Sequence, residues 1–137
     1  MNAVNRQLIE TMRCTAQYGL LILLTLLLLL HVLVLLKVIP YNIVWGNRLK
    51  SDNDMYRFEI FSLLITTIFL IIIMKHAGFI KIDIPGTIIT YALWAMTGLF
   101  LVNTIGNSIS TNKIERLLLT PITVLLTLLS LVLALSN

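Results

Sequence analysis

Three ionisable side chains, His31, Arg48 and Glu59, are of the types that acid-base and anion-binding chemistry needs. A carboxylate can act as a base, a histidine can relay a proton, and a guanidinium can hold an anion. His31 and Glu59 lie within long apolar stretches, where a charged side chain costs roughly 2.5 to 3.5 kcal/mol on insertion scales. If all three side chains surround one small cavity, they define a ligand-binding or catalytic site.

Each of these residues also has a structural interpretation. His31 follows a run of leucines, so it fits a neutral histidine that is bonded to a Thr or Asn of another helix. Glu59 falls within the first two turns of its helix, where the helix dipole favours an anion. Its carboxylate can pair with Arg48 or with Arg116 across the end of a bundle. The sequence leaves both interpretations open.

The elements that must position these side chains are four apolar stretches of near-equal length. A bilayer core about 30 Å thick needs about 20 predominantly apolar residues for each helical span. The expected spans cover residues 18–39, 55–75, 85–105 and 114–135. Residues 3–17 form either an amphipathic interfacial helix or a direct extension of the first span. We therefore predict a single all-α integral membrane domain over residues 1–137, a four-transmembrane-helix bundle with up-down-up-down order.

The composition agrees with a membrane protein and excludes several other classes. Apolar residues make up 58% of the chain and charged residues 12%, whereas soluble domains carry about 25% charged residues. The net charge of +4 is spread over every connection, so we expect no nucleic-acid partner. His31 and His76 fall toward opposite membrane sides, and the sequence lacks zinc-site spacing, so we expect no metal and no cofactor.

Local signals place the ends of the predicted helices. Pro40 disfavours helix at the residue before it, which predicts that the first helix ends near Ile39. Ser51 lies where a capping residue is needed and predicts a second helix that begins near Asp52. Asn112 supplies a similar start signal for the fourth helix.

Four consecutive spans put the first and third connections on the same side of the membrane. The polar residues that fall at or near this side form a candidate polar cluster: His31, Trp45, Arg48, Glu59, Asn103, Asn107, Glu115, Arg116 and Thr120. Six Lys and Arg residues lie near these two connections, against four on the opposite side. This excess favours a cytoplasmic position for the first and third connections.

Small and hydroxyl-bearing residues recur at helical spacing along the last three spans. Examples are Ser62 and Thr66 in the second span, Thr97 in the third, and Thr127 and Ser130 in the fourth. In lipid, helices associate through small residues and through hydrogen bonds between hydroxyl groups, so helix packing is one interpretation of these stripes. A polar passage between the helices is the other.

Several short motifs carry a resemblance to a known group of proteins. They are Trp45-Gly46-Asn47-Arg48-Leu49, Phe58-Glu59, Asn103-Thr104-Ile105-Gly106-Asn107, and Glu115-Arg116 followed by Thr120-Pro121-Ile122-Thr123. With these motifs the chain looks like a group of small, uncharacterised four-span bacterial integral membrane proteins, over nearly its whole length from the first span onward. The resemblance implies the four-span fold and a bacterial cytoplasmic (inner) membrane, and it implies no catalytic residue. The chain is also similar in size to small multidrug transporters, but its first span lacks their membrane-embedded Glu and offers only His31.

Three functional classes fit these observations. The leading one is a non-enzymatic accessory or interaction protein of the membrane, with membrane lipid, a second copy or another membrane protein as its partner. The second is a small transporter or permeation protein, in which an oligomer encloses the hydroxyl stripes. The third is a membrane enzyme that acts on a lipid head group through Glu59 and His31.

Overall fold

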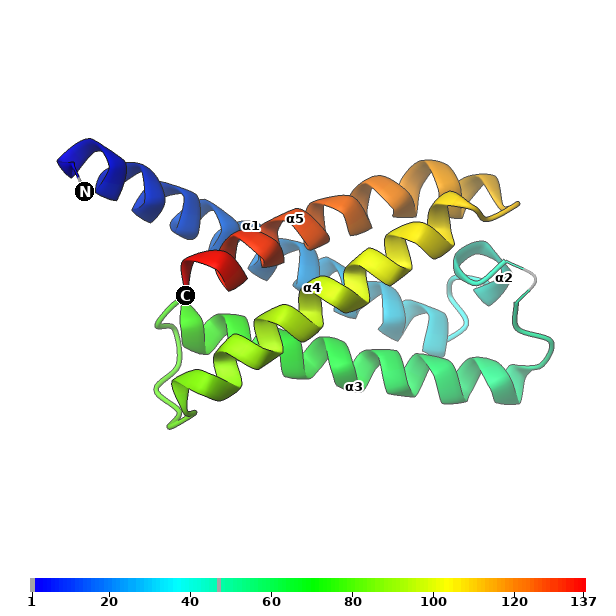
Figure 1. Cartoon of the computed structure of the whole chain (residues 1–137). Coiled ribbons are helices and arrows are strands. Elements are labelled where there is room, and N and C mark those ends of the chain that lie inside the picture. The colour runs from blue at the N-terminus through cyan, green and yellow to red at the C-terminus, as the bar shows by residue number, and fades with distance from the viewer. Residues whose placement is uncertain (1, 47) are drawn as a thin grey trace.

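The computed structural model describes residues 2–46 and 48–137. Helices form 81% of the chain. They are α1 (Ala3–Leu35), α2 (Tyr41–Val44), α3 (Asp52–His76), α4 (Gly86–Ser108), the π-helix η1 (Glu115–Leu119) and α5 (Thr120–Ser136). Four rods, namely α1, α3, α4 and η1 with α5, are long and apolar enough to cross a membrane. Successive rods run in opposite directions (Figure 1), and the predicted all-α four-helix bundle is confirmed.

The first span is part of a longer helix than its apolar stretch. α1 continues without a break through residues 3–17, which therefore extend the span directly. Its end comes before Ile39, the predicted last residue. Lys37 takes a positive φ of 57°, and the N–H of Val38 donates to the carbonyl of Leu33 at 2.9 Å. A left-handed residue with such a hydrogen bond closes a helix, so the chain turns before it reaches the proline.

The two predicted capping residues act as expected. The Ser51 hydroxyl accepts a hydrogen bond from the N–H of Asp54 at 3.1 Å, which starts α3. The Asn112 side-chain oxygen accepts one from the N–H of Ile114 at 2.9 Å. The last helix then widens into η1 just before Pro121. A proline ring crowds the preceding α-helical turn and lacks an N–H, and a π turn relieves that conflict.

The long helices pack unevenly around the bundle centre. Leu20, Leu24, Leu93, Met96 and Leu126 are fully buried there. α4 packs along α5, and α1 packs against α3 and α5, whereas α3 and α4 make few contacts with each other. Figure 1 shows α3 and α4 diverging from their connection toward the end of the bundle that holds α2. A cavity at that end owes its position to this divergence.

Hydroxyl groups of α4 and α5 face one another inside the bundle. The hydroxyl oxygens of Thr97 and Ser130 lie 3.1 Å apart, and those of Thr104 and Thr127 lie 3.5 Å apart. Each of these four hydroxyls also lies within hydrogen-bond distance of a carbonyl one turn earlier in its own helix. Along α4 and α5, these contacts support the packing interpretation of the hydroxyl stripes.

A polar network joins all four long helices at the opposite end of the bundle. Gln17 Nε2 lies 2.9 Å from His76 Nδ1, and His76 Nε2 lies 3.2 Å from Asn137 Oδ1. Asn137 Nδ2 in turn donates to the Thr90 hydroxyl at 2.7 Å. The helices are therefore tied together at this end, whereas α3 and α4 diverge toward the other (Figure 1).

Candidate functional site

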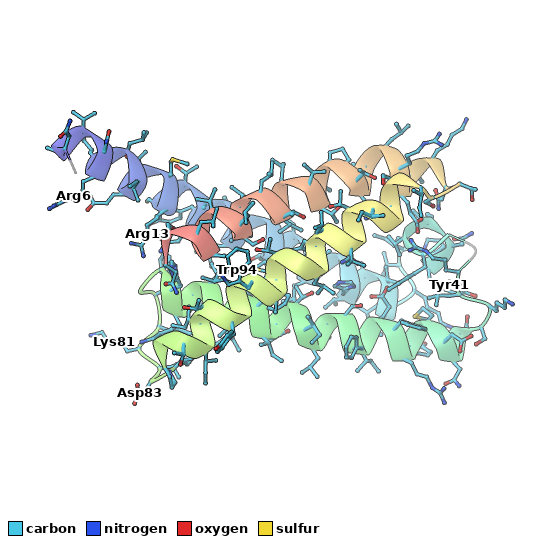
Figure 2. The ribbon with its side chains drawn as sticks, in the orientation of Figure 1. Arg6, Arg13, Tyr41, Lys81, Asp83 and Trp94 are labelled. Carbon is cyan, nitrogen blue, oxygen red and sulfur yellow. The ribbon has the colours of Figure 1, made fainter. Side chains whose placement is uncertain are left out.

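The α2 end of the bundle holds the cavity between α3 and α4. Figure 2 shows Tyr41 at this end and Arg13, Lys81 and Asp83 at the opposite end, as the order of the spans predicts. The cavity has a volume of about 680 Å³ and is lined by side chains from every long helix and from the connection that contains α2. Ligand pockets in proteins typically measure about 300 to 1,000 Å³, so a small amphiphile or part of a lipid fits.

The walls of the cavity are largely apolar and reach the outer surface of the bundle. Phe58 and Phe61 of α3 line one side and Leu99 and Val102 of α4 line the other. Their exposed fractions are 49%, 62%, 39% and 65%, respectively. Because α3 and α4 are long and apolar enough to cross a membrane, these exposed walls give the cavity a side that would face lipid.

Glu59 is the meeting point of three elements. Its side chain is 1% exposed, and His31 Nδ1 of α1 lies 2.7 Å from Glu59 Oε2. The indole N–H of Trp45, from the first connection, donates to Glu59 Oε1. The prediction that Glu59 pairs with Arg48 or Arg116 is therefore wrong, as is the prediction that His31 bonds a Thr or Asn.

Arg48 pairs instead with Glu115 at the start of the last helix. Its Nη2 lies 2.8 Å from Glu115 Oε1, its Nε donates to the Trp45 carbonyl at 3.3 Å, and its guanidinium lies 5.8 Å from the Trp45 ring centroid. Gly46 has a positive φ of 55°, and a Cβ there would lie 3.6 Å from Glu115 Oε1. The conformation of the connection, rather than the depth of each residue in its helix, thus selects the partner of Arg48.

Asn112 fastens the same connection to the last helix. Its Nδ2 donates to the carbonyls of Asn42 and Ile43 at 2.9 and 3.1 Å. Sequence reasoning identified Asn112 only as a helix cap, because nothing in the local pattern indicates a contact with residues so distant in the chain. Asn112 and Arg48 together hold the connection in place over the polar end of the cavity.

The cavity contains most of the candidate polar cluster and three further hydroxyl groups, those of Ser62, Thr66 and Thr123. Its polar lining residues are His31, Trp45, Arg48, Glu59, Ser62, Thr66, Asn103, Asn107 and Thr123. Ser62 and Thr66 share the cavity face of α3 with Glu59, and this helical spacing is the signal that could have added them to the cluster.

Some predicted site residues lie elsewhere. Arg116 is exposed and does not line the cavity, and the Thr120 hydroxyl donates to the Glu115 carbonyl at 3.3 Å. Asn47, a member of the Trp45–Leu49 motif, lies outside the described residues. In the described parts of the chain, no three His, Cys, Asp or Glu side chains are close enough to hold a metal ion.

The fold and the cavity define a multi-pass membrane protein with a lateral opening between two of its helices. Comparisons with models of known protein families, with curated proteins and with solved structures found no match for this chain. The resemblance to small four-span bacterial membrane proteins stays a prediction, and function has to be argued from the site itself.

Proposed function

We propose that the protein is a non-enzymatic accessory protein of a bacterial cytoplasmic membrane that binds one membrane lipid between α3 and α4. The observation that carries this proposal is the lateral cavity, which has exposed aromatic and aliphatic walls and a polar end. An amphiphile has the same division into an apolar chain and a polar headgroup. Apolar walls with a few polar groups at one place are typical of ligand sites.

The depth of the cavity supports a ligand from a single leaflet. On α3 the lining extends from Phe58 to Phe69, a length of about 17 Å at 1.5 Å per residue. This is about half the thickness of a 30 Å hydrocarbon core. The polar end lies on the side of the first and third connections, so the lipid comes from the leaflet on that side. The distribution of Lys and Arg favours the cytoplasmic leaflet.

The transporter class has less support from this geometry. A passage through the bundle needs polar groups over the full depth of the membrane, but the hydroxyls of Thr97 and Ser130 are engaged with each other and with carbonyls. The far end is also bridged by Gln17 and His76. These contacts favour a binding site that is open to one leaflet over a continuous passage.

A second candidate function is a membrane enzyme that acts on a lipid head group. The contact that favours it is the 2.7 Å distance between His31 Nδ1 and Glu59 Oε2. A carboxylate that accepts the Nδ1 proton orients the imidazole and leaves Nε2 free to take a proton from a hydroxyl group or a water molecule. Glu59→Gln and His31→Asn test this candidate. Loss of cellular function at normal membrane abundance supports an acid-base role, and normal function in both variants excludes it.

Lipid binding is tested by filling the cavity from its rim. Leu99 and Leu101 lie two residues apart on α4, and both are exposed, but only Leu99 lines the cavity. The protein is extracted in a mild uncharged detergent, and bound lipid is counted by native mass spectrometry. We expect Leu99→Trp to lose most of the lipid bound to the wild-type protein, and Leu101→Trp to retain it. Equal lipid occupancy in the two variants would contradict the proposal.

A further inference from the structure

We infer that the lipid bound in this cavity carries a phosphate in its headgroup, which is held by Arg48 together with the amides of Asn103 and Asn107. This inference rests on the proposed lipid-binding function and adds the chemistry of the headgroup. All three side chains line the same cavity, and they come from two elements, the first connection and α4.

Arg48 is held in place and still has donors to offer. Its Nη2 contacts Glu115, its Nε contacts the Trp45 carbonyl, and its guanidinium lies over the Trp45 ring. Arginine carries five N–H donors in a fixed fork, so the Nη1 donors are left over among the contacts of residues 2–46 and 48–137. The side chain is 49% exposed. An arginine oriented in this way binds a phosphate with little further loss of side-chain freedom.

Gly106 lies beside the Nη1 atom of Arg48. A Cβ at position 106 would lie 3.6 Å from this nitrogen, so a larger side chain would extend into the volume beside the guanidinium. Gly106 also lines the cavity. The glycine therefore leaves room for a headgroup oxygen next to the free donors.

The two carboxylates near the cavity are closed to a headgroup. Glu59 is 1% exposed, and its two oxygens face His31 and Trp45. Glu115 is fully buried beside Arg48. An entering headgroup thus meets the guanidinium without meeting a free carboxylate, which favours an anionic group over an ammonium group.

Asn103 and Asn107 add neutral donors from α4. They lie one helical turn apart on α4, so their side chains share a face, and both line the cavity. Each amide carries two N–H donors. Phosphate oxygens accept several such bonds at once, and bonds to a charged acceptor are the stronger ones.

A lipid fits this site better than free phosphate does. The apolar walls that continue from the polar end toward Phe69 serve no purpose for inorganic phosphate, but they bury an acyl chain. Phe61 and Val102 line the cavity and are also exposed on the outer surface, which gives an acyl chain access from the bilayer.

The test compares lipids with identical chains and different headgroups in one uncharged maltoside detergent. Native mass spectrometry measures the affinity for dioleoyl phosphatidic acid, dioleoyl phosphatidylglycerol and dioleoylglycerol. We expect the two phosphate lipids to bind about tenfold more tightly or better, because charge-assisted bonds are lost with the phosphate. In Arg48→Gln/Glu115→Gln, which removes both charges together, we expect this preference to fall to about unity.

Two further variants test the inference without changing the Arg48–Glu115 pair, so that a loss of phosphate preference does not reflect a loss of folding. Asn103→Ala/Asn107→Ala leaves the Arg48–Glu115 pair intact, and we expect it to lose part of the preference for phosphate. Lys50→Gln removes an exposed cation of the same connection that does not line the cavity, and we expect it to keep the full preference.

The outcomes separate this inference from the proposed function. If dioleoylglycerol binds as tightly as phosphatidic acid, and Leu99→Trp weakens both, the phosphate assignment fails and lipid binding stands. If Leu99→Trp weakens the binding of none of these lipids, both the lipid-binding function and the phosphate assignment fail. Inorganic phosphate that displaces phosphatidic acid at low millimolar concentration and also binds alone would assign the site to free phosphate and overturn the lipid headgroup.

Discussion

His31 Nδ1 lies 2.7 Å from Glu59 Oε2, which joins α1 to α3 inside the membrane. The second carboxylate oxygen of Glu59 accepts the indole N–H of Trp45, so the first connection is joined to the same point. A buried carboxylate in lipid needs such partners, because no water replaces them. The contact therefore holds the polar end of the cavity in shape whether or not His31 also moves a proton.

Removing Glu59 should destabilise the protein by about 1 to 3 kcal/mol, because the partly buried donors of His31 and Trp45 are then left without an acceptor. Glu59→Leu tests this, with the melting temperature in detergent as the measurement. Because His31 and Glu59 share one contact, the effects of His31→Leu and Glu59→Leu should not add in the double variant. Additive losses would show that the two side chains are not coupled.

Breaking the Arg48–Glu115 pair from one side should cost more than removing it entirely. Arg48→Gln leaves Glu115 buried and charged, and such unpaired charges typically cost about 3 to 5 kcal/mol. We expect Arg48→Gln/Glu115→Gln to be more stable than Arg48→Gln alone. The measurement is the folded fraction that size-exclusion chromatography detects after heating to a series of temperatures. Lys50→Gln is the matched control and should unfold like the wild-type protein. A double variant that is less stable than the single one would contradict the pairing.

The sequence predicts the fold well because the length and hydropathy of each stretch determine whether it can span a membrane. The order of the spans also places Arg48 and Asn107 at the same end of the bundle, and both residues line one cavity. Ser51 marks the start of α3 because its capping contact is local, with a partner three residues away.

The partners within the site could not be predicted in the same way. Arg48 contacts Glu115 rather than Glu59 because the connection folds back onto the last helix through Gly46 and Asn112. The path of this connection depends on its backbone dihedral angles, which the periodicity of apolar residues does not predict. The sequence also does not predict that α3 diverges from α4. Both helices are apolar on most of their surface, so each is soluble in lipid whether it packs against the other or not.

The Lys37–Asp52 contact predicts a pH dependence outside the membrane spans. Lys37 lies beyond the end of α1, and its hydrogen bond to Asp52 raises the pKa of Lys37 above the usual 10.5. The contact therefore stabilises the folded protein below pH 10.5, and this contribution is lost as the pH rises through the raised pKa. We expect Asp52→Asn to lower the melting temperature slightly at neutral pH and low salt, and to match the wild-type protein once the pH exceeds the raised pKa of Lys37.

High salt should reduce the same difference at neutral pH, because both side chains are half-exposed and ions screen such pairs. Asp83→Asn at the opposite end of the bundle is the control. A difference between Asp52→Asn and the wild-type protein that persists unchanged at high pH would show that the ion pair is not its cause.

Trp45 offers a direct optical readout of the cavity. It lines the cavity, whereas Trp94 does not, so Trp94→Phe leaves Trp45 as the sole indole. Brominated lipids quench tryptophan fluorescence on contact. If a lipid binds in the cavity, the fluorescence of Trp45 should be quenched at a low mole fraction of brominated lipid, and the quenching should saturate. Adding Ala95→Phe, which fills the cavity, should abolish the saturating phase, whereas Leu101→Phe on the outer surface of α4 should not. Quenching that rises only in proportion to the brominated fraction would indicate bulk lipid contact.

Cysteine labelling distinguishes a packed α4–α5 contact from a water-filled passage. In a Cys14→Ser background, which removes the exposed native thiol, Thr97→Cys and Ser130→Cys should resist a water-soluble maleimide, because both positions are buried between the helices. Asn103→Cys should react, since residue 103 is exposed at the polar end of the cavity. Added phosphatidic acid should slow the reaction at position 103. Fast labelling at positions 97 and 130 in the folded protein would favour the transporter class, because the thiols would then face water along the α4–α5 stripe.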